Sequence, residues 1–171
     1  MKGYVQVYTG DGKGKTTAAL GLILRARGAG LRVYLGQFIK KGDFSEIKSL
    51  RERFPEVTVE QYGLGHFIKE EPSPDDIAAA MEGLGKLRTA VLSGDYDIII
   101  ADEAGPAVTV GLFPADELVS LIDQKPDEVE LVITGRGVDK TVMARADLIT
   151  EMRSVKHYMD DGVGARQGIE S

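Results

Sequence analysis

The stretch YTGDGKGKTTAALG at Tyr8–Gly21 constrains the fold of this chain more than any other feature. It follows a segment in which β-branched and aromatic residues alternate with other residues, as in a strand, and it continues into a sequence typical of a helix. A glycine-rich turn between a strand and a helix presents backbone N–H groups to an anion, next to the positive end of the helix. The stretch therefore predicts a loop that binds a triphosphate.

The turn fits the phosphate-loop pattern G-x-x-x-x-G-K-[ST] in its last three places. Gly14, Lys15 and Thr16 occupy those places, whereas Thr9 stands where the pattern has its first glycine. Lys15 supplies a positive charge for terminal phosphate oxygens, and the hydroxyl of Thr16 suits Mg²⁺. The alternative is a glycine-rich turn with a chance lysine, which the flanking strand and helix disfavour.

Strands and helices are expected to alternate along the whole chain. Apolar runs predict strands at 3–10, 31–40, 56–63, 96–103 and 128–137, and a last strand or extended segment at 147–157. Helices are expected from about residue 15 to 28 and at 43–54, 73–94, 114–124 and 138–146, with Ser45 as one possible cap of the second. This alternation predicts an α/β fold with a parallel sheet covered by helices on both faces. Residues 1–171 are expected to form a single domain.

Ligand sites of parallel sheets lie at the carboxyl ends of the strands. The segments expected on that rim are Thr9–Lys15, the residues after Gln37, Gly63–Ile68, Asp102 with Glu103, and Thr134–Gly137.

Asp102 and Glu103 end the apolar strand expected at 96–103. Carboxylates at this place would hold Mg²⁺ directly or through its water. The alternative is a pair of capping or solvated acids, and the phosphate loop on the same rim favours the metal.

For several other residues the sequence allows two interpretations, a contact with a ligand or a structural position on the surface or in a loop. Arg25 would reach an anion or lie on an exposed helix face. His66 belongs to a pocket or to the surface, and His157, beside a lysine, is the better neighbour for a phosphate or cofactor. The glycine-hinged segment Tyr62–Ile68 would line a site or only pack as a loop.

Composition excludes several classes of protein. The formal net charge is −6, which disfavours a nucleic-acid binder because a phosphate backbone prefers a basic face. Cysteine is absent, which rules out disulfides, zinc-thiolate sites and cysteine nucleophiles. No stretch has the length and hydrophobicity of a signal peptide or a membrane span. A cytoplasmic protein without a membrane partner is therefore expected.

Several segments together resemble the P-loop type of ATP:corrinoid adenosyltransferases. TGDGKGKTTAALG is similar to that family's variant loop, including threonine in place of the first glycine. GQFIK at Gly36–Lys40 resembles its second strand and IADE at 100–103 its acidic strand end. VITGRG, ADLITEMRSVKH and GVGARQGIE resemble its C-terminal third. The resemblance covers nearly the whole chain and implies a P-loop NTPase-like, RecA-like fold.

The resemblance implies that the Co(I) of a reduced corrinoid attacks the ribose C5′ of ATP, and that triphosphate leaves. Family members bind ATP in a reversed sense for this reaction. Because Co(I) is itself the nucleophile, the protein has to align the reactants and stabilise triphosphate. The roles implied are catalytic for Lys15, Thr16 and Glu103, and Mg²⁺ binding for Thr16, Asp102 and Glu103. The residues implied in ATP binding are Gly10, Asp11, Gly12, Lys13, Gly14, Lys15, Thr16, Thr17 and Arg25.

The corrinoid side departs from the family pattern. Relatives often carry a Phe and a Trp that displace the axial base of the corrinoid, where this chain has His66 and Ile68, with Phe67 between them. The resemblance implies that these three residues contact the corrinoid. Phe67 and Ile68 are expected to form an apolar floor, and His66 is expected to point away from the metal. A homodimer and a reductase that supplies Co(I) are also implied.

Two alternatives remain open. A P-loop kinase for a small molecule would release ADP instead of triphosphate. A non-catalytic carrier of ATP or corrinoid would bind ATP without turnover, and the altered segments GLGHFI and AGPAVTVG at 104–111 favour it.

Overall fold

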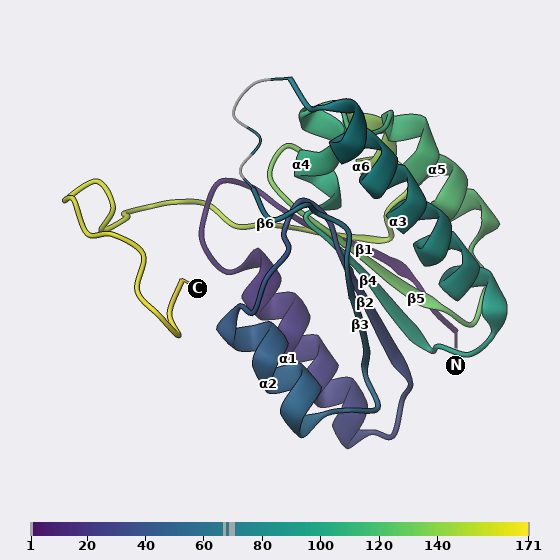
Figure 1. Cartoon of the computed structure of the whole chain (residues 1–171). Coiled ribbons are helices and arrows are strands. Elements are labelled where there is room, and N and C mark those ends of the chain that lie inside the picture. The colour runs from purple at the N-terminus through teal and green to yellow at the C-terminus, as the bar shows by residue number, and fades with distance from the viewer. Residues whose placement is uncertain (1, 67, 69–70, 171) are drawn as a thin grey trace.

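The computed structural model of the chain describes residues 2–66, 68 and 71–170. Within this part, six parallel strands form one sheet in the order β3-β2-β4-β5-β1-β6, and helices cover both of its faces (Figure 1). The strands are β1 (Val5–Thr9), β2 (Val33–Gln37), β3 (Thr58–Gln61), β4 (Ile98–Asp102), β5 (Glu130–Thr134) and β6 (Leu148–Glu151), and the helices are α1 (Lys15–Gly28), α2 (Ser45–Arg53), α3 (Pro74–Ser93), α4 (Ala104–Thr109), α5 (Ala115–Gln124) and α6 (Lys140–Met143). The parallel α/β fold predicted from the alternation is confirmed.

The sheet separates two apolar cores, because its central strands are buried on both faces. Ile98 and Ile100 of β4 belong to the core under α1 and α2. Ile99 and Ala101 alternate with them and belong to the core under α3 and α5. Figure 1 shows these helix pairs on opposite sides of the sheet. β5 lies between β1 and β4, so one strand separates the phosphate loop from the acidic strand end.

Two local expectations are corrected by the structure. Residues 104–111 contain helix α4, which was not expected because its six residues are too short for helical periodicity to register. Ser45 is the first residue of α2, and Phe44 occupies the cap position without a side-chain cap bond. The helix expected at 73–94 is present as α3, which begins with a reciprocal capping box between Ser73 and Asp76 and has Pro74 in its first turn.

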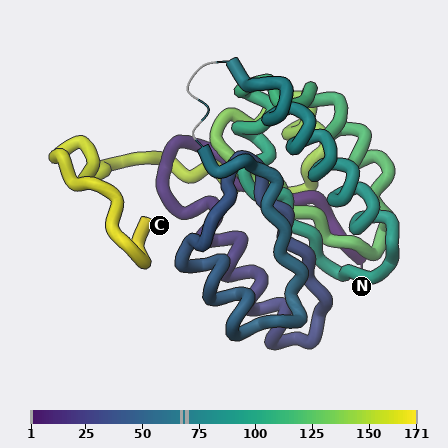
Figure 2. Tube along the Cα trace, in the orientation of Figure 1, coloured from purple at the N-terminus to yellow at the C-terminus, as the bar shows by residue number. Residues whose placement is uncertain are grey.

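The chain after β6 has no regular secondary structure through residue 170. Figure 2 shows residues 152–170 leaving the sheet beside the phosphate loop, extending away from it and then turning back, so that Ile169 contacts Lys13 of the loop. Among the described residues, no helix has the length and hydrophobicity that crossing a membrane would require.

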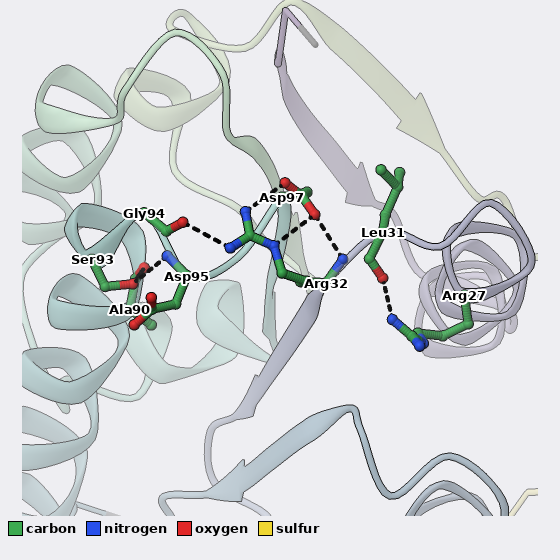
Figure 3. A network of polar contacts seen from close by, with 8 residues as sticks. All are labelled: Arg27, Leu31, Arg32, Ala90, Ser93, Gly94, Asp95 and Asp97. Atoms are coloured by element: carbon green, nitrogen blue, oxygen red, sulfur yellow. Dashed lines mark hydrogen bonds and ion pairs between the residues drawn. The ribbon is translucent and has the colours of Figure 1, made fainter.

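At the opposite, amino-terminal edge of the sheet, Arg32 and Asp97 join the starts of β2 and β4 (Figure 3). The Arg32 guanidinium and backbone N–H both donate to the Asp97 carboxylate, at 2.8 to 3.1 Å. The guanidinium also donates to the carbonyl of Gly94 at 3.0 Å. The Arg32 side chain, and then its backbone N–H, lower the pKa of Asp97 from 3.8 to about 2.

We predict that Asp97→Asn lowers the free energy of unfolding by about 1 kcal/mol at neutral pH, the usual range for an exposed pair. Because the folded pKa lies below the unfolded one, the carboxylate stabilises the fold above pH 3.8, and this contribution disappears as the pH falls towards 2. Urea unfolding at a series of pH values should therefore show the gap between parent and variant closing in that interval. Asp161→Asn, in the exposed C-terminal segment, is the control. A difference in unfolding free energy between the parent and Asp97→Asn that is the same at all pH values would contradict the prediction.

Candidate functional site

The phosphate loop connects β1 to α1 at the carboxyl rim of the sheet. Gly10 and Gly14 have φ values of 94° and 119°, which glycine adopts without the steric cost that other residues incur. The N–H of Gly12 donates to the carbonyl of Met152 at 2.6 Å, and a Cβ at Gly12 would lie 2.7 Å from that oxygen. The loop is thus held against the chain that follows β6, and this close approach requires glycine.

Lys15 is the first residue of α1, and its side chain turns back into the loop. Its Nζ donates to the carbonyls of Gly10 at 2.6 Å and Gly12 at 2.7 Å, and the residue is only 8% exposed. Burial, and then the positive charge of Arg136, lower the pKa of Lys15, while Glu103 acts in the opposite direction. The ammonium group is therefore held in place inside the loop.

Asp102 ends β4 and is completely buried. Its Oδ1 accepts the hydroxyl protons of Thr16 at 2.9 Å and Thr134 at 2.7 Å. Its Oδ2 accepts from the side-chain amide of Gln37 at 2.9 Å. The carboxylate thus joins the phosphate loop to the ends of β2 and β5.

Glu103 follows in the left-handed conformation, at a φ of 57°, and caps α4. Its N–H donates to Thr134 Oγ1 at 3.1 Å, and its carboxylate lies 3.9 Å from Lys40 Nζ. Burial, and then the neighbouring Asp102, raise the pKa of the Glu103 carboxyl group, against the charges of Lys40, Lys15 and Arg136. Glu103 is the more accessible of the two acids, with a side chain that is 24% exposed.

The expected gathering of segments on one rim is confirmed. The phosphate loop, the residues after β2, the end of β4 and the end of β5 meet through Asp102, Glu103 and Thr134. Gly63 joins them because its N–H donates to the carbonyl of Lys40 at 3.3 Å. Sequence reasoning missed the cations at Lys40 and Arg136. The signal that would have located them is their position directly after strands β2 and β5.

Other residues of the predicted ATP site are exposed to solvent. Asp11, Lys13 and Thr17 are exposed, and Lys13 Nζ donates to the carbonyl of Ile169 at 2.7 Å. Arg25 is exposed on α1 and lines an open groove of about 330 Å³ with Tyr8, Ala18, Gly21 and Leu22. It lies roughly 15 Å along the helix from Lys15, at 1.5 Å per residue.

The residues predicted to face a corrinoid are only partly described. His66 Nε2 lies 3.0 Å from Asp76 Oδ1, so the ring is engaged at the start of α3. Ile68 is half-buried and packs against the core under α3 and α5. Phe67 lies outside the described residues. In the C-terminal segment, His157 Nδ1 accepts from the N–H of Met159 at 3.1 Å.

The rim combines a buried ammonium group with oxygen donors from Thr16, Asp102 and Glu103. Oxygen donors of this kind suit Mg²⁺, which keeps water ligands and takes the rest from one or two carboxylates and phosphate oxygens. The described residues contain no cluster of three or more histidine, cysteine or acidic side chains that could hold a metal ion. Thr16 fits this role because it donates its proton to Asp102 and keeps its lone pairs for a cation.

Comparisons with known proteins point to one family. The family model described as "ATP:corrinoid adenosyltransferase BtuR/CobO/CobP" matches residues 1–171. A corrinoid adenosyltransferase of Pseudomonas aeruginosa is 33% identical over 171 residues, covering 99% of this chain and 84% of that protein. The corrinoid adenosyltransferase CobA of Salmonella typhimurium is 33% identical over 169 residues, covering 99% and 86%. A Nostoc protein, "Uncharacterized protein all2391", is 36% identical over 172 residues, covering 92% of this chain and 45% of that longer relative.

We predict that Thr134→Val lowers the free energy of unfolding by about 2–3 kcal/mol, because it removes one of the three donors of buried Asp102 and leaves the Glu103 N–H without this acceptor. Thr134→Ser keeps the hydroxyl and should cost only about 1 kcal/mol, for the lost methyl group. Chemical denaturation of the three proteins measures both values. Equal losses in the two variants would show that the hydroxyl is not what matters at this position.

Proposed function

We propose, from the premise that this chain belongs to the ATP:corrinoid adenosyltransferase family, that it transfers the 5′-deoxyadenosyl group of ATP to the cobalt of a reduced corrinoid. The Co(I) electron pair forms the bond to C5′, the C5′–O bond breaks, and its electrons leave with triphosphate. The observation that carries the proposal is the phosphate loop bonded through Thr16 to the buried acid of β4, in a chain that the family model matches from end to end.

In this reaction Lys15 stabilises the leaving triphosphate. Two of its three ammonium protons are directed to loop carbonyls, which aims the group and leaves the third for a phosphate oxygen. The N-terminus of α1 adds fixed positive potential. The ammonium group and this helix end are both in place before the reaction, so little reorganisation is needed as negative charge develops.

Mg²⁺ would be held by Thr16 and Glu103, and when bound it would neutralise charge on the triphosphate. Asp102 belongs to this metal site, and the three hydrogen bonds to its oxygens support a role in orienting Thr16. The remaining loop residues, Lys13 and Thr17 included, would contact the triphosphate. Arg25 would reach ATP from the groove on α1.

On the corrinoid side, Phe67 and Ile68 would form the apolar floor. The contact of His66 with Asp76 supports the view that this ring points away from the cobalt. A cytoplasmic homodimer that receives Co(I) corrinoid from a reductase completes the proposal and follows from the family resemblance.

The proposal is tested by anaerobic incubation with ATP, Mg²⁺ and chemically reduced cobalamin. The expected result is the absorption spectrum of a Co–C product together with one triphosphate per product. Release of ADP would identify a kinase, and tight ATP binding without triphosphate release would identify a carrier.

We predict that Lys15→Ala lowers the rate of adenosyl transfer about a hundredfold or more, because loss of one charged contact to a developing anion costs on the order of 3 kcal/mol. The free energy of unfolding should also fall, by about 1–3 kcal/mol, because two hydrogen bonds of a buried ammonium group are lost. Unfolding curves therefore check that the variant is folded under the conditions of the rate assay. Lys48→Ala, on the exposed face of α2, is the matched control. A rate within a few-fold of the parent would remove Lys15 from the mechanism.

We predict that Glu103→Gln raises the Mg²⁺ concentration needed for half-maximal activity about tenfold, while ATP affinity measured without metal changes less. Asp102→Asn is titrated beside it, because it tests the acid that contacts Thr16. Unfolding of both variants is measured in parallel to separate metal binding from stability. An unchanged response to Mg²⁺ in both would make the two acids structural.

A further inference from the structure

A line of hydrogen bonds leads from the acid at the end of β4 to the loop after β2. The side-chain Nε2 of Gln37 donates to Asp102 Oδ2 at 2.9 Å. The side-chain Oε1 of Gln37 accepts from Nε2 of Gln61, also at 2.9 Å. The side-chain Oε1 of Gln61 in turn accepts a hydrogen bond from the backbone N–H of Gly42 at 3.2 Å. Gln37 is completely buried, and Gln61 is half-buried at the end of β3.

The direction of this line is dictated by Asp102. A carboxylate only accepts, so Gln37 has to present its NH₂ group to it and turn its oxygen towards Gln61. Gln61 must then present its own NH₂ group, and its oxygen is left to accept from Gly42. Each amide orientation thus depends on the one before it, and hydrogen bonds in such a chain strengthen one another.

The loop at the end of this line lies between the two halves of the proposed site. Ile39 has a φ of 65°, a rare conformation for a β-branched residue and one that surrounding contacts must maintain. Lys40 of the same loop lies 3.9 Å from Glu103 on the metal side. On the other side, a Cβ at Gly63 would lie 2.0 Å from the Ile39 carbonyl, so this loop closely contacts the start of the Gly63–Ile68 segment.

We propose that Gln37 and Gln61 are positioning residues that couple occupation of the ATP site to the conformation of loop 38–42, and through it to the corrinoid-facing segment. This inference rests on the proposed function. Thr16, which would bind the metal of ATP, and Gln37 share the carboxylate of Asp102. A ligand that acts on Thr16 therefore biases the amides that hold the loop, and corrinoid should bind more tightly once ATP is present.

The experiment compares the binding of cob(II)alamin, followed by its absorption spectrum, with and without ATP and Mg²⁺. The ratio of the two dissociation constants measures the coupling. In Gln61→Glu a second acceptor faces Gln37, and in Gln61→Leu the link is removed without added charge. Both variants should lower the ratio at least fivefold and leave the dissociation constant of ATP within twofold of the parent. Gln124→Glu, on the exposed end of α5, is the control for added charge and should keep the parent ratio.

Three outcomes would overturn the inference. The first is that ATP does not change the affinity of the parent chain for cob(II)alamin. The second is that both variants at position 61 keep the parent ratio of dissociation constants. The third is that only Gln61→Glu lowers this ratio, which would indicate an effect of the added charge. A parent chain that forms no Co–C product would instead contradict the proposed function, and the binding ratio is measured without turnover. The two failures are therefore distinguishable.

Discussion

The site depends on the burial of one negative charge. Removing a carboxylate from water is costly unless donors replace the lost solvent, and Asp102 is completely buried. Its donors come from three different places in the chain: Thr16 at the start of α1, Gln37 at the end of β2 and Thr134 at the end of β5. Satisfying this charge therefore fixes the relative positions of the loops around it.

The two acids at the end of β4, Asp102 and Glu103, differ in burial and in hydrogen-bond partners. Asp102 faces into the sheet and is surrounded by hydroxyl and amide donors. Glu103 turns the chain out of the strand, in a conformation that is rare for a non-glycine residue, and its side chain reaches the rim beside Lys40. The inner acid organises the structure, and the outer acid is the more accessible of the two.

The phosphate loop is held from outside the sheet as well. The backbone N–H of Met152 donates to the carbonyl of Thr9 at 2.8 Å, and the carbonyl of Met152 accepts the N–H of Gly12 at 2.6 Å. The C-terminal segment returns to the loop at Lys13 through Ile169. The last part of that segment is bound to itself, because Glu170 pairs with Arg166 and with Tyr158. The phosphate loop is thus contacted by residues far away in the chain.

The sequence by itself determined the order of strands and helices, the parallel sheet and the phosphate loop. These follow from local signals: apolar runs and the glycine-rich turn before Lys15. It did not reveal α4, whose six residues are shorter than two helical turns, nor which of two adjacent acids is buried. Only the tertiary structure decided that Asp102 turns inward, that Gln37 and Gln61 connect it to loop 38–42, and that Lys13 contacts the C-terminal segment. Each of these contacts joins residues far apart in sequence, and the order in which the strands pair decides which of them meet.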